Sequence, residues 1–211
     1  EQIAPKFQTL KFTDPATGLT MDYNLFVPKN YDPAKKYPLV MFMADASTAG
    51  LGAAAPLKQG YGGIIWATDE SQAKHPSFVL VPAFVGKKDA RGMSAVVNDQ
   101  WQTTAEVDTA YKLLNDVVEK YSVDKNRLYA TGQSMGGMIS FYLNANHPDL
   151  FAASLFVSSQ WDIKVLEPLA QAKFFYIVSK GDTKASGGMA EVGNMLKKDG
   201  VSFGSTEFAA N

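Results

Sequence analysis

The sequence predicts a single α/β domain over residues 1–211, with a mostly parallel sheet, helices on both faces of the sheet and an antiparallel hairpin at the N-terminus. Two observations lead to this fold class. Short apolar runs typical of buried strands recur along the chain, and stretches with helical spacing of apolar residues separate them. Strands that alternate with helices favour parallel pairing, because each helix returns the chain to the same end of the sheet.

The hairpin is predicted from two β-like segments, residues 7–13 and 21–28, which the turn-rich residues 14–18 connect. Five later runs are short, apolar and continuous, as expected for strands that are buried on both faces. These runs are residues 38–43, 78–81, 128–131, 153–157 and 174–178. Residues 202–209 look like the beginning of one more strand.

A helix is predicted over residues 107–118, where apolar side chains recur three and four positions apart. Thr103 and Glu106 stand three residues apart at its start, which fits a capping box. A shorter helix around residues 189–196 is expected to end at Gly200. The Ala- and Gly-rich residues 44–63 are interpreted as a loop over the edge of the sheet.

Composition excludes several classes of protein. Hydrophobic residues make up 46% and charged residues 19% of the 211 residues, which is ordinary for a globular domain. The formal net charge is −1 without a basic cluster, so no nucleic-acid partner is expected. No apolar run is long enough to span a membrane. There are no cysteines, which excludes disulfides and thiolate chemistry, and no cluster of ligands suggests a metal or organic cofactor.

The motif that carries chemistry is Gly-Gln-Ser-Met-Gly at residues 132–136, which matches G-x-S-x-G. A predicted strand ends just before it and residues 135–146 are a predicted helix just after it, as the nucleophile-elbow pattern requires. Such a strained turn lifts the hydroxyl of Ser134 above the carboxyl edge of the sheet. The backbone N–H of Met135 then faces a developing oxyanion. A glycine-rich structural turn with an incidental serine is the alternative.

The blocks at residues 13–28, 37–40 and 121–153 resemble secreted α/β-hydrolase esterases, in particular the polyhydroxybutyrate-depolymerase and feruloyl-esterase-like group related to prolyl-oligopeptidase-type hydrolases. The resemblance implies an α/β-hydrolase fold and cleavage of a small-molecule or polymer-linked ester through an acyl-enzyme on Ser134. It also implies a secreted or periplasmic location. The first residue, Glu1, fits a chain whose export signal has been removed, although an N-terminus chosen for expression fits equally well.

The order of catalytic residues in this fold is Ser, acid, His, with the acid in a loop after a later strand. Asp182 follows the strand at 174–178 and is therefore the predicted acid, whereas Asp162, after the preceding strand, is the weaker competitor. A solvated loop aspartate in a Gly-Asp turn is the alternative reading of Asp182.

The second oxyanion donor is expected in the loop after the strand at 38–43, where the family carries His-Gly. This sequence has Met43-Ala-Asp-Ala46 instead, and Ala46 is the positional choice for the donor. Asp45 is interpreted either as a local cap for the Ala/Gly-rich loop or as an anion that changes the polarity of the acyl pocket.

Neither histidine of the sequence suits Ser134. His147 lies 13 residues further along the same predicted helix, about 20 Å away, against the roughly 3 Å that a general base needs. His75 precedes the strand at 78–81 and belongs to the amino end of the sheet, about 16 Å from the edge that carries the serine. The family pattern places the histidine after one more strand, so we expect it, together with the closing strand and helix, beyond Asn211.

Three functions remain open at this stage. An ester hydrolase is the first, and a serine peptidase or amidase on the same fold is the second, because both reactions use the same elbow. The third is a catalytically inactive hydrolase fold used for binding, which the missing histidine and the altered oxyanion loop keep open. Trp161, directly after the strand at 153–157, either lines an acyl or aryl pocket or packs in the core.

Overall fold

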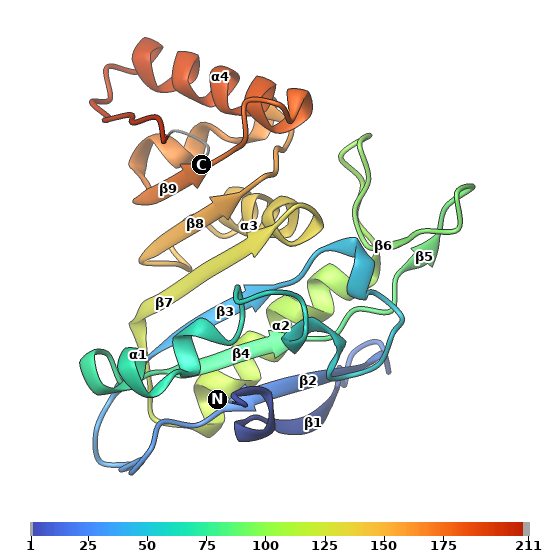
Figure 1. The fold of residues 1–211 in the computed structure, drawn as a ribbon, viewed down its shortest axis with the longest axis vertical. Helices are drawn as coiled ribbons and strands as arrows, with labels where there is room; N and C mark the ends of the chain where they lie inside the picture. Colours follow the sequence, from blue (N-terminus) through green and yellow to red (C-terminus); the bar gives the residue numbers. More distant parts are fainter. Residues whose placement is uncertain (1, 209–211) are drawn as a thin grey trace.

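The computed structural model describes residues 2–208, and in that range the main sheet has seven strands in the order β1-β2-β4-β3-β7-β8-β9 (Figure 1). The first two strands form an antiparallel hairpin, β2 pairs antiparallel with β4, and all further neighbours are parallel. The predicted fold class is thus confirmed. The strands are β1 (Gln8–Thr13), β2 (Thr20–Phe26), β3 (Tyr37–Met43), β4 (Phe78–Pro82), β7 (Val123–Gln133), β8 (Ala153–Val157) and β9 (Phe174–Ile177).

The hairpin turn is held by Asp14, whose carboxylate accepts hydrogen bonds from the N–H of Ala16 and the hydroxyl of Thr17. Lys112 adds an ion pair to the same carboxylate at 2.8 Å. That lysine lies on helix α2 (Ala105–Lys120), so the pair joins the hairpin to the helix that crosses behind it. These bonds hold the pKa of Asp14 at about 2, below its usual value of 3.8.

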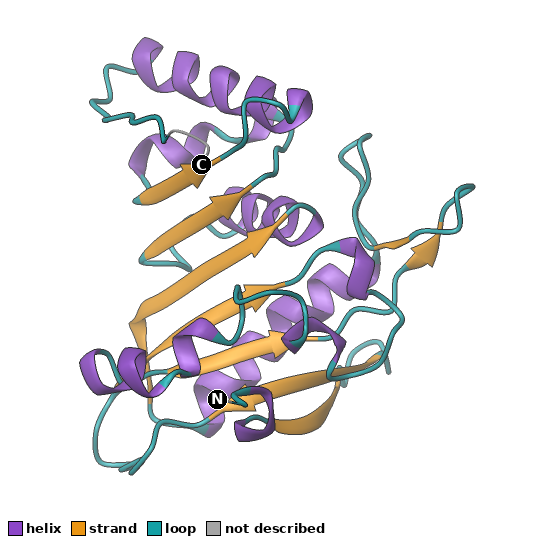
Figure 2. Ribbon diagram, in the orientation of Figure 1, coloured by secondary structure: helices purple, strands orange, loops and turns teal. Residues whose placement is uncertain are grey.

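Helices α2 and α3 (Met135–Asn146) cover one face of the sheet (Figure 2). Their buried side chains share one core cluster with Leu39, Met41 and Phe156 of the sheet. Short 3-10 helices cover the other face over β2, β3 and β4. They are η1 (Ala4–Lys6), η3 (Ala55–Leu57) and η4 (Ile65–Ala67). Helix α1 (Asp69–Lys74) follows η4 in the sequence. Residues 44–63 therefore lie partly on a sheet face, since Leu57 packs with Phe42 of β3, and not only over the edge as predicted.

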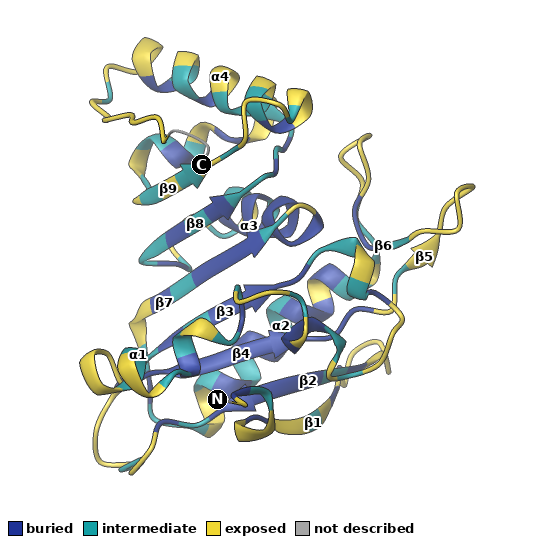
Figure 3. Ribbon diagram, in the orientation of Figure 1, coloured by how far each residue is buried: buried dark blue, intermediate teal, exposed yellow. Residues whose placement is uncertain are grey.

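The C-terminal part differs from the prediction in two ways. Strand β9 is the edge of the sheet and is only half covered, with Phe175 61% and Ile177 41% exposed (Figure 3). Helix α4 (Thr183–Lys198) follows it. Residues 202–208 form no strand, and residue 209 of that prediction lies outside the described residues.

The predicted capping box is wrong. Helix α2 begins after Thr104, whose side chain makes no capping bond. The carboxylate of Glu106 instead accepts the backbone N–H groups of Val85 and Gly86, each at 2.8 Å. Glu106 therefore fixes the loop after β4 rather than the start of its own helix.

Candidate active site

Ser134 lies at a sharp bend between β7 and α3. Its backbone has φ 52° and ψ −118°, a strained conformation for a residue with a side chain. Two bonds hold it there: its N–H donates to the carbonyl of Val157 at the end of β8, and its carbonyl accepts from Met138. The residue is exposed although its neighbours on both sides are not. The structure thus presents the hydroxyl at the carboxyl edge of the sheet, as the motif predicts.

The two flanking glycines are required by the close approach of α3 to β3. A Cβ atom on Gly136 would lie 1.7 Å from the carbonyl oxygen of Met43, and a Cβ atom on Gly132 would lie 2.4 Å from the carbonyl carbon of Gly136. Both contacts are with backbone, which cannot rotate away as a side chain can. The motif is therefore a packing requirement as well as a chemical one.

Both predicted oxyanion donors begin a helix. Met135 is the first residue of α3, and Ala46 is the first residue of η2 (Ala46–Thr48). The first N–H groups of a helix have no acceptor within it, so they are available to an anion. The two segments start from adjacent parallel strands, since Met43 of β3 is in register with Gly132 of β7. The sheet therefore brings the two predicted donors to the same edge.

Asp45 ties the loop after β3 to the elbow. Its carboxylate accepts the N–H of Ser47 at 2.8 Å and the side-chain amide of Gln133, the residue before Ser134, at 3.2 Å. Its own N–H donates to the amide oxygen of Gln59 at 3.0 Å. Burial by itself raises the pKa of Asp45, but the hydrogen bonds from Ser47 and Gln133 outweigh it and lower the pKa below the ordinary value. The capping interpretation of Asp45 is thus confirmed, and the same carboxylate reaches the elbow.

Asp182, the predicted acid, follows β9 and caps α4, because its Oδ1 accepts the N–H of Ala185 at 3.0 Å. The sheet order β7-β8-β9 places it two strands from the elbow, which is about 10 Å at the usual strand spacing. Its competitor Asp162 caps the 3-10 helix η5 (Ile163–Val165) by accepting the N–H of Lys164. Each carboxylate thus has a structural task, and no hydrogen bond joins either to Ser134 within residues 2–208.

The two histidines lie where the sequence places them. His147 ends α3, the helix that Ser134 begins, and stacks on Tyr111 with ring centroids 3.7 Å apart. Burial lowers its pKa. His75 ends α1, before the start of β4, so it belongs to the opposite edge of the sheet. Neither side chain is placed to take a proton from Ser134.

Trp161 is buried, with 4% of its surface exposed, and packs edge-on against Trp101 and Tyr142. Of its two predicted roles the structure favours packing. Trp101, which has a left-handed backbone with φ 62°, is 38% exposed and is the member of the pair that faces solvent. No sequence pattern indicates this role of Trp101, because its contact with Trp161 joins two loops that lie 60 residues apart in the chain.

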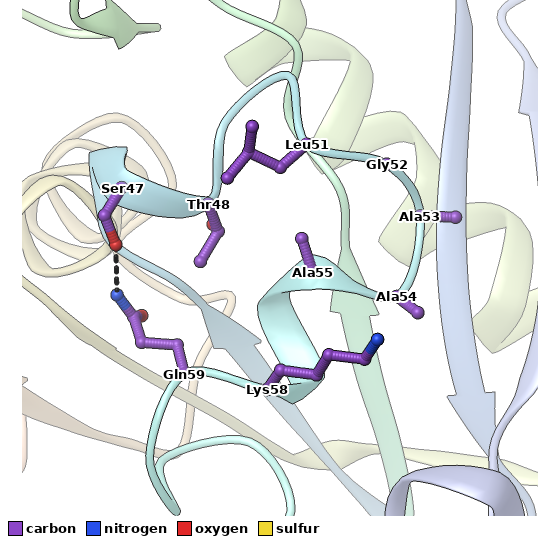
Figure 4. Close-up of a pocket in the computed structure, with 9 residues that line it drawn as sticks. All are labelled: Ser47, Thr48, Leu51, Gly52, Ala53, Ala54, Ala55, Lys58 and Gln59. Atoms are coloured by element: carbon purple, nitrogen blue, oxygen red, sulfur yellow. Dashed lines mark hydrogen bonds between the residues drawn. The ribbon is translucent and has the colours of Figure 1, made fainter.

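Two open grooves, each of about 620 Å³, flank the segment that begins at η2. Figure 4 shows the first, where the side chains of Ser47 and Gln59 are hydrogen-bonded to each other at 3.1 Å. The second lies between η2 and the loop after β4, and Ala46 is among its lining residues. Neither groove is lined by Ser134 or Asp182, so both lie beside the elbow rather than over it.

Among residues 2–208, no three His, Cys, Asp or Glu side chains gather in a way that would hold a metal ion. Within the same residues, every helix is too short or too polar to cross a bilayer. The carboxyl edge of the sheet carries a strained serine, two helix-starting N–H groups and, after β9, a carboxylate.

The fold and the elbow define an α/β-hydrolase, and the comparisons with known proteins agree. Residues 15–173 match the sequence family described as "Putative esterase", and the chain belongs to that family. No curated protein sequence matches it.

Solved structures show the same fold. A thermostable esterase superposes with a TM-score of 0.85 at 26% identity over 94% of this chain, which spans 53% of that esterase. A ferulic acid esterase superposes with a TM-score of 0.71 at 16% identity, over 93% of this chain and 87% of the other. A Bacteroides ovatus protein described as a putative dipeptidyl aminopeptidase IV gives 0.67 at 15% identity, over 93% of this chain and 31% of the other. The chain thus spans about half the length of the first of these proteins.

Proposed function

We propose that the protein is a serine carboxylic-ester hydrolase in which Ser134 is the nucleophile. The observation that carries the proposal is the strained, exposed Ser134 at the junction of β7 and α3, in a chain of an esterase family. Strain of this kind is retained where the surrounding structure enforces it, and here backbone hydrogen bonds to Val157 and Met138 hold Ser134 at the bend.

In the proposed reaction the Ser134 hydroxyl attacks the acyl carbon while a base takes its proton. The N–H groups of Met135 and Ala46 bind the oxyanion of the tetrahedral intermediate. The intermediate collapses to an acyl-enzyme as the base returns the proton to the leaving alcohol. Water, deprotonated by the same base, then attacks the acyl-enzyme, and the acid product leaves with Ser134 restored.

The base is proposed to be a histidine beyond Asn211, because His75 and His147 are both misplaced. Asp182 would hold its imidazole. Since Ala185 occupies Oδ1 of that carboxylate, Oδ2 is the oxygen that would accept the imidazole N–H. The helix cap fixes the carboxylate in advance, so the orientation of the histidine would not cost further ordering of Asp182.

The test uses the whole protein, including the part after Asn211 that would carry the histidine, and compares initial rates on p-nitrophenyl acetate and on a peptide p-nitroanilide. Ser134→Ala is expected to lower ester hydrolysis by about 10³-fold or more, and Asp182→Asn by about 10²- to 10⁴-fold. Asparagine is also a good helix cap, so the second change leaves α4 in place. Asp162→Asn is the matched control, because Asp162 also follows a strand and caps a helix.

The outcomes separate the candidate functions. A loss of activity in Asp162→Asn but not in Asp182→Asn would reassign the acid. Faster cleavage of the anilide than of the ester would favour a peptidase or amidase. Unchanged ester hydrolysis in Ser134→Ala would remove the nucleophile from Ser134.

A further inference from the structure

The second groove carries apolar side chains that are open to solvent. It lies between the segment 46–51 and the loop after β4, and we name it the η2 groove. Three large apolar side chains on it are exposed: Leu51 by 71%, Val85 by 65% and Met93 by 47%. Exposed apolar side chains that gather at one hollow indicate a surface that binds an apolar group.

The walls of the η2 groove are fixed by hydrogen bonds. The N–H of Gly50 donates to the carbonyl of Phe84 at 2.9 Å, which joins the two walls at the base. The carboxylate of Glu106 holds the N–H groups of Val85 and Gly86. The short strands β5 (Lys87–Lys88) and β6 (Ser94–Ala95) pair with each other and complete the outer wall, which projects from the body of the domain in Figure 1. The hollow is therefore formed before a ligand arrives.

The position of the groove relative to the elbow decides which part of an ester it would receive. Ala46 lines the groove, and its N–H is a proposed oxyanion donor. In the sheet order β3-β7-β8-β9, Ser134 follows β7, η2 follows the neighbouring β3, and Asp182 follows β9 on the other side. The base that Asp182 orients must reach the leaving oxygen, so the alcohol part lies on the β8–β9 side. The acyl carbon carries the oxyanion that the Ala46 N–H would bind, so the acyl chain attached to this carbon can enter the groove that Ala46 lines.

We propose that the η2 groove binds the acyl chain of the substrate and that this chain is aliphatic. The inference rests on the proposed ester hydrolysis at Ser134 and names its substrate class. The large apolar side chains of the lining are aliphatic or a thioether, no aromatic ring is among its residues within the described chain, and its polar side chains are Ser47, Lys88 and Ser94. The apolar side chains suit a flexible alkyl chain of several carbons. Met93 is the flexible apolar side chain of this lining and would adapt to chains of different length.

The experiment measures kcat/KM of the full chain on p-nitrophenyl acetate and p-nitrophenyl hexanoate. Each fully buried methylene favours binding about fourfold, and a groove open on one side gives about twofold. Four added methylenes then make hexanoate about 16-fold better than acetate. Met93→Ala is expected to reduce this ratio of hexanoate to acetate to about fivefold. Ile65→Ala is the matched control, because Ile65 is 46% exposed but lies outside the groove.

Two further measurements keep the inference separate from the proposed function. With hexyl acetate, Met93→Ala should change nothing, and a loss confined to this ester would show that the groove holds the alcohol. Calorimetric binding of methyl hexanoate to Ser134→Ala, with and without Met93→Ala, needs no turnover. Binding without ester hydrolysis in the unmodified whole protein, including the part after Asn211, would defeat the proposed function and keep the groove. A wild-type ratio of kcat/KM on hexanoate to kcat/KM on acetate near one would overturn the proposal that this groove binds the acyl chain. Equal ratios in Met93→Ala and Ile65→Ala would overturn it as well.

Discussion

Replacement of Gly136 by alanine tests the geometry of the elbow, because the added methyl group has a defined collision. Its Cβ would lie 1.7 Å from the carbonyl oxygen of Met43, whereas a carbon–oxygen contact needs about 3.3 Å. Helix α3 and strand β3 would have to separate by about 1.6 Å, the difference between these two distances. Such overpacking costs about 3 kcal/mol or more, which exceeds the gain of about 1 kcal/mol from replacing a helical glycine.

Gly187→Ala is the matched control for this change. Gly187 also lies in a helix, α4, but nothing stands within 4 Å of the position that a Cβ atom would take. Alanine there is expected to stabilise the protein by about 0.5–1 kcal/mol. The two variants should therefore shift the free energy of unfolding in opposite directions.

The assay is urea unfolding followed by circular dichroism, together with kcat/KM on p-nitrophenyl acetate. A shift of about 1 Å at a catalytic group lowers the rate about 100-fold, so folded Gly136→Ala should be nearly inactive and Gly187→Ala fully active. If Gly136→Ala proved as stable and as active as the unmodified chain, the close contact between α3 and β3 would not exist and the strain at Ser134 would have no cause.

Three further changes probe other parts of the account. Asp45→Asn should lower kcat about tenfold and raise KM little, because the Asp45 carboxylate positions the loop of Ala46 without touching the substrate. A variant with the same kcat as the wild type would show that the hydrogen bonds of Asp45 are dispensable for catalysis. Asp14 has a folded pKa of about 2, below its ordinary 3.8, so its contribution to stability is complete above pH 4 and is lost as the pH falls through 2. The difference in urea midpoint between the wild type and Asp14→Asn should shrink over that range, and a constant difference would contradict the assignment. His75→Gln and His147→Gln should each keep kcat/KM within about twofold, and a 100-fold loss in either would identify the base within these residues.

Most of the fold was predictable because it depends on local patterns. Continuous apolar runs identified five of the strands in the sheet, and the turn-rich residues 14–18 identified the hairpin. The half-exposed face of β9 was not predictable, since an edge strand carries the same apolar residues as a central one. Its exposure depends on what packs against it, which a sequence pattern does not state.

In the candidate site, too, features that depend on neighbouring residues were predictable and features that depend on distant contacts were not. Ser134 was predictable because strand, glycines and helix follow one another directly along the chain. Glu106 was misassigned for the opposite reason: its spacing from Thr103 is right for a capping box, but two N–H groups from the distant loop at Val85 and Gly86 bind its carboxylate more favourably. The link from Asp45 to Gln133 was also invisible in sequence, since 88 residues separate the two partners.

The most direct test of the central claim is covalent labelling of the chain with a fluorophosphonate, followed by peptide mass spectrometry. We predict one adduct, on the peptide that contains Ser134, and its disappearance in Ser134→Ala. An adduct on another serine, or ester hydrolysis by the unmodified chain without any adduct on Ser134, would contradict the account.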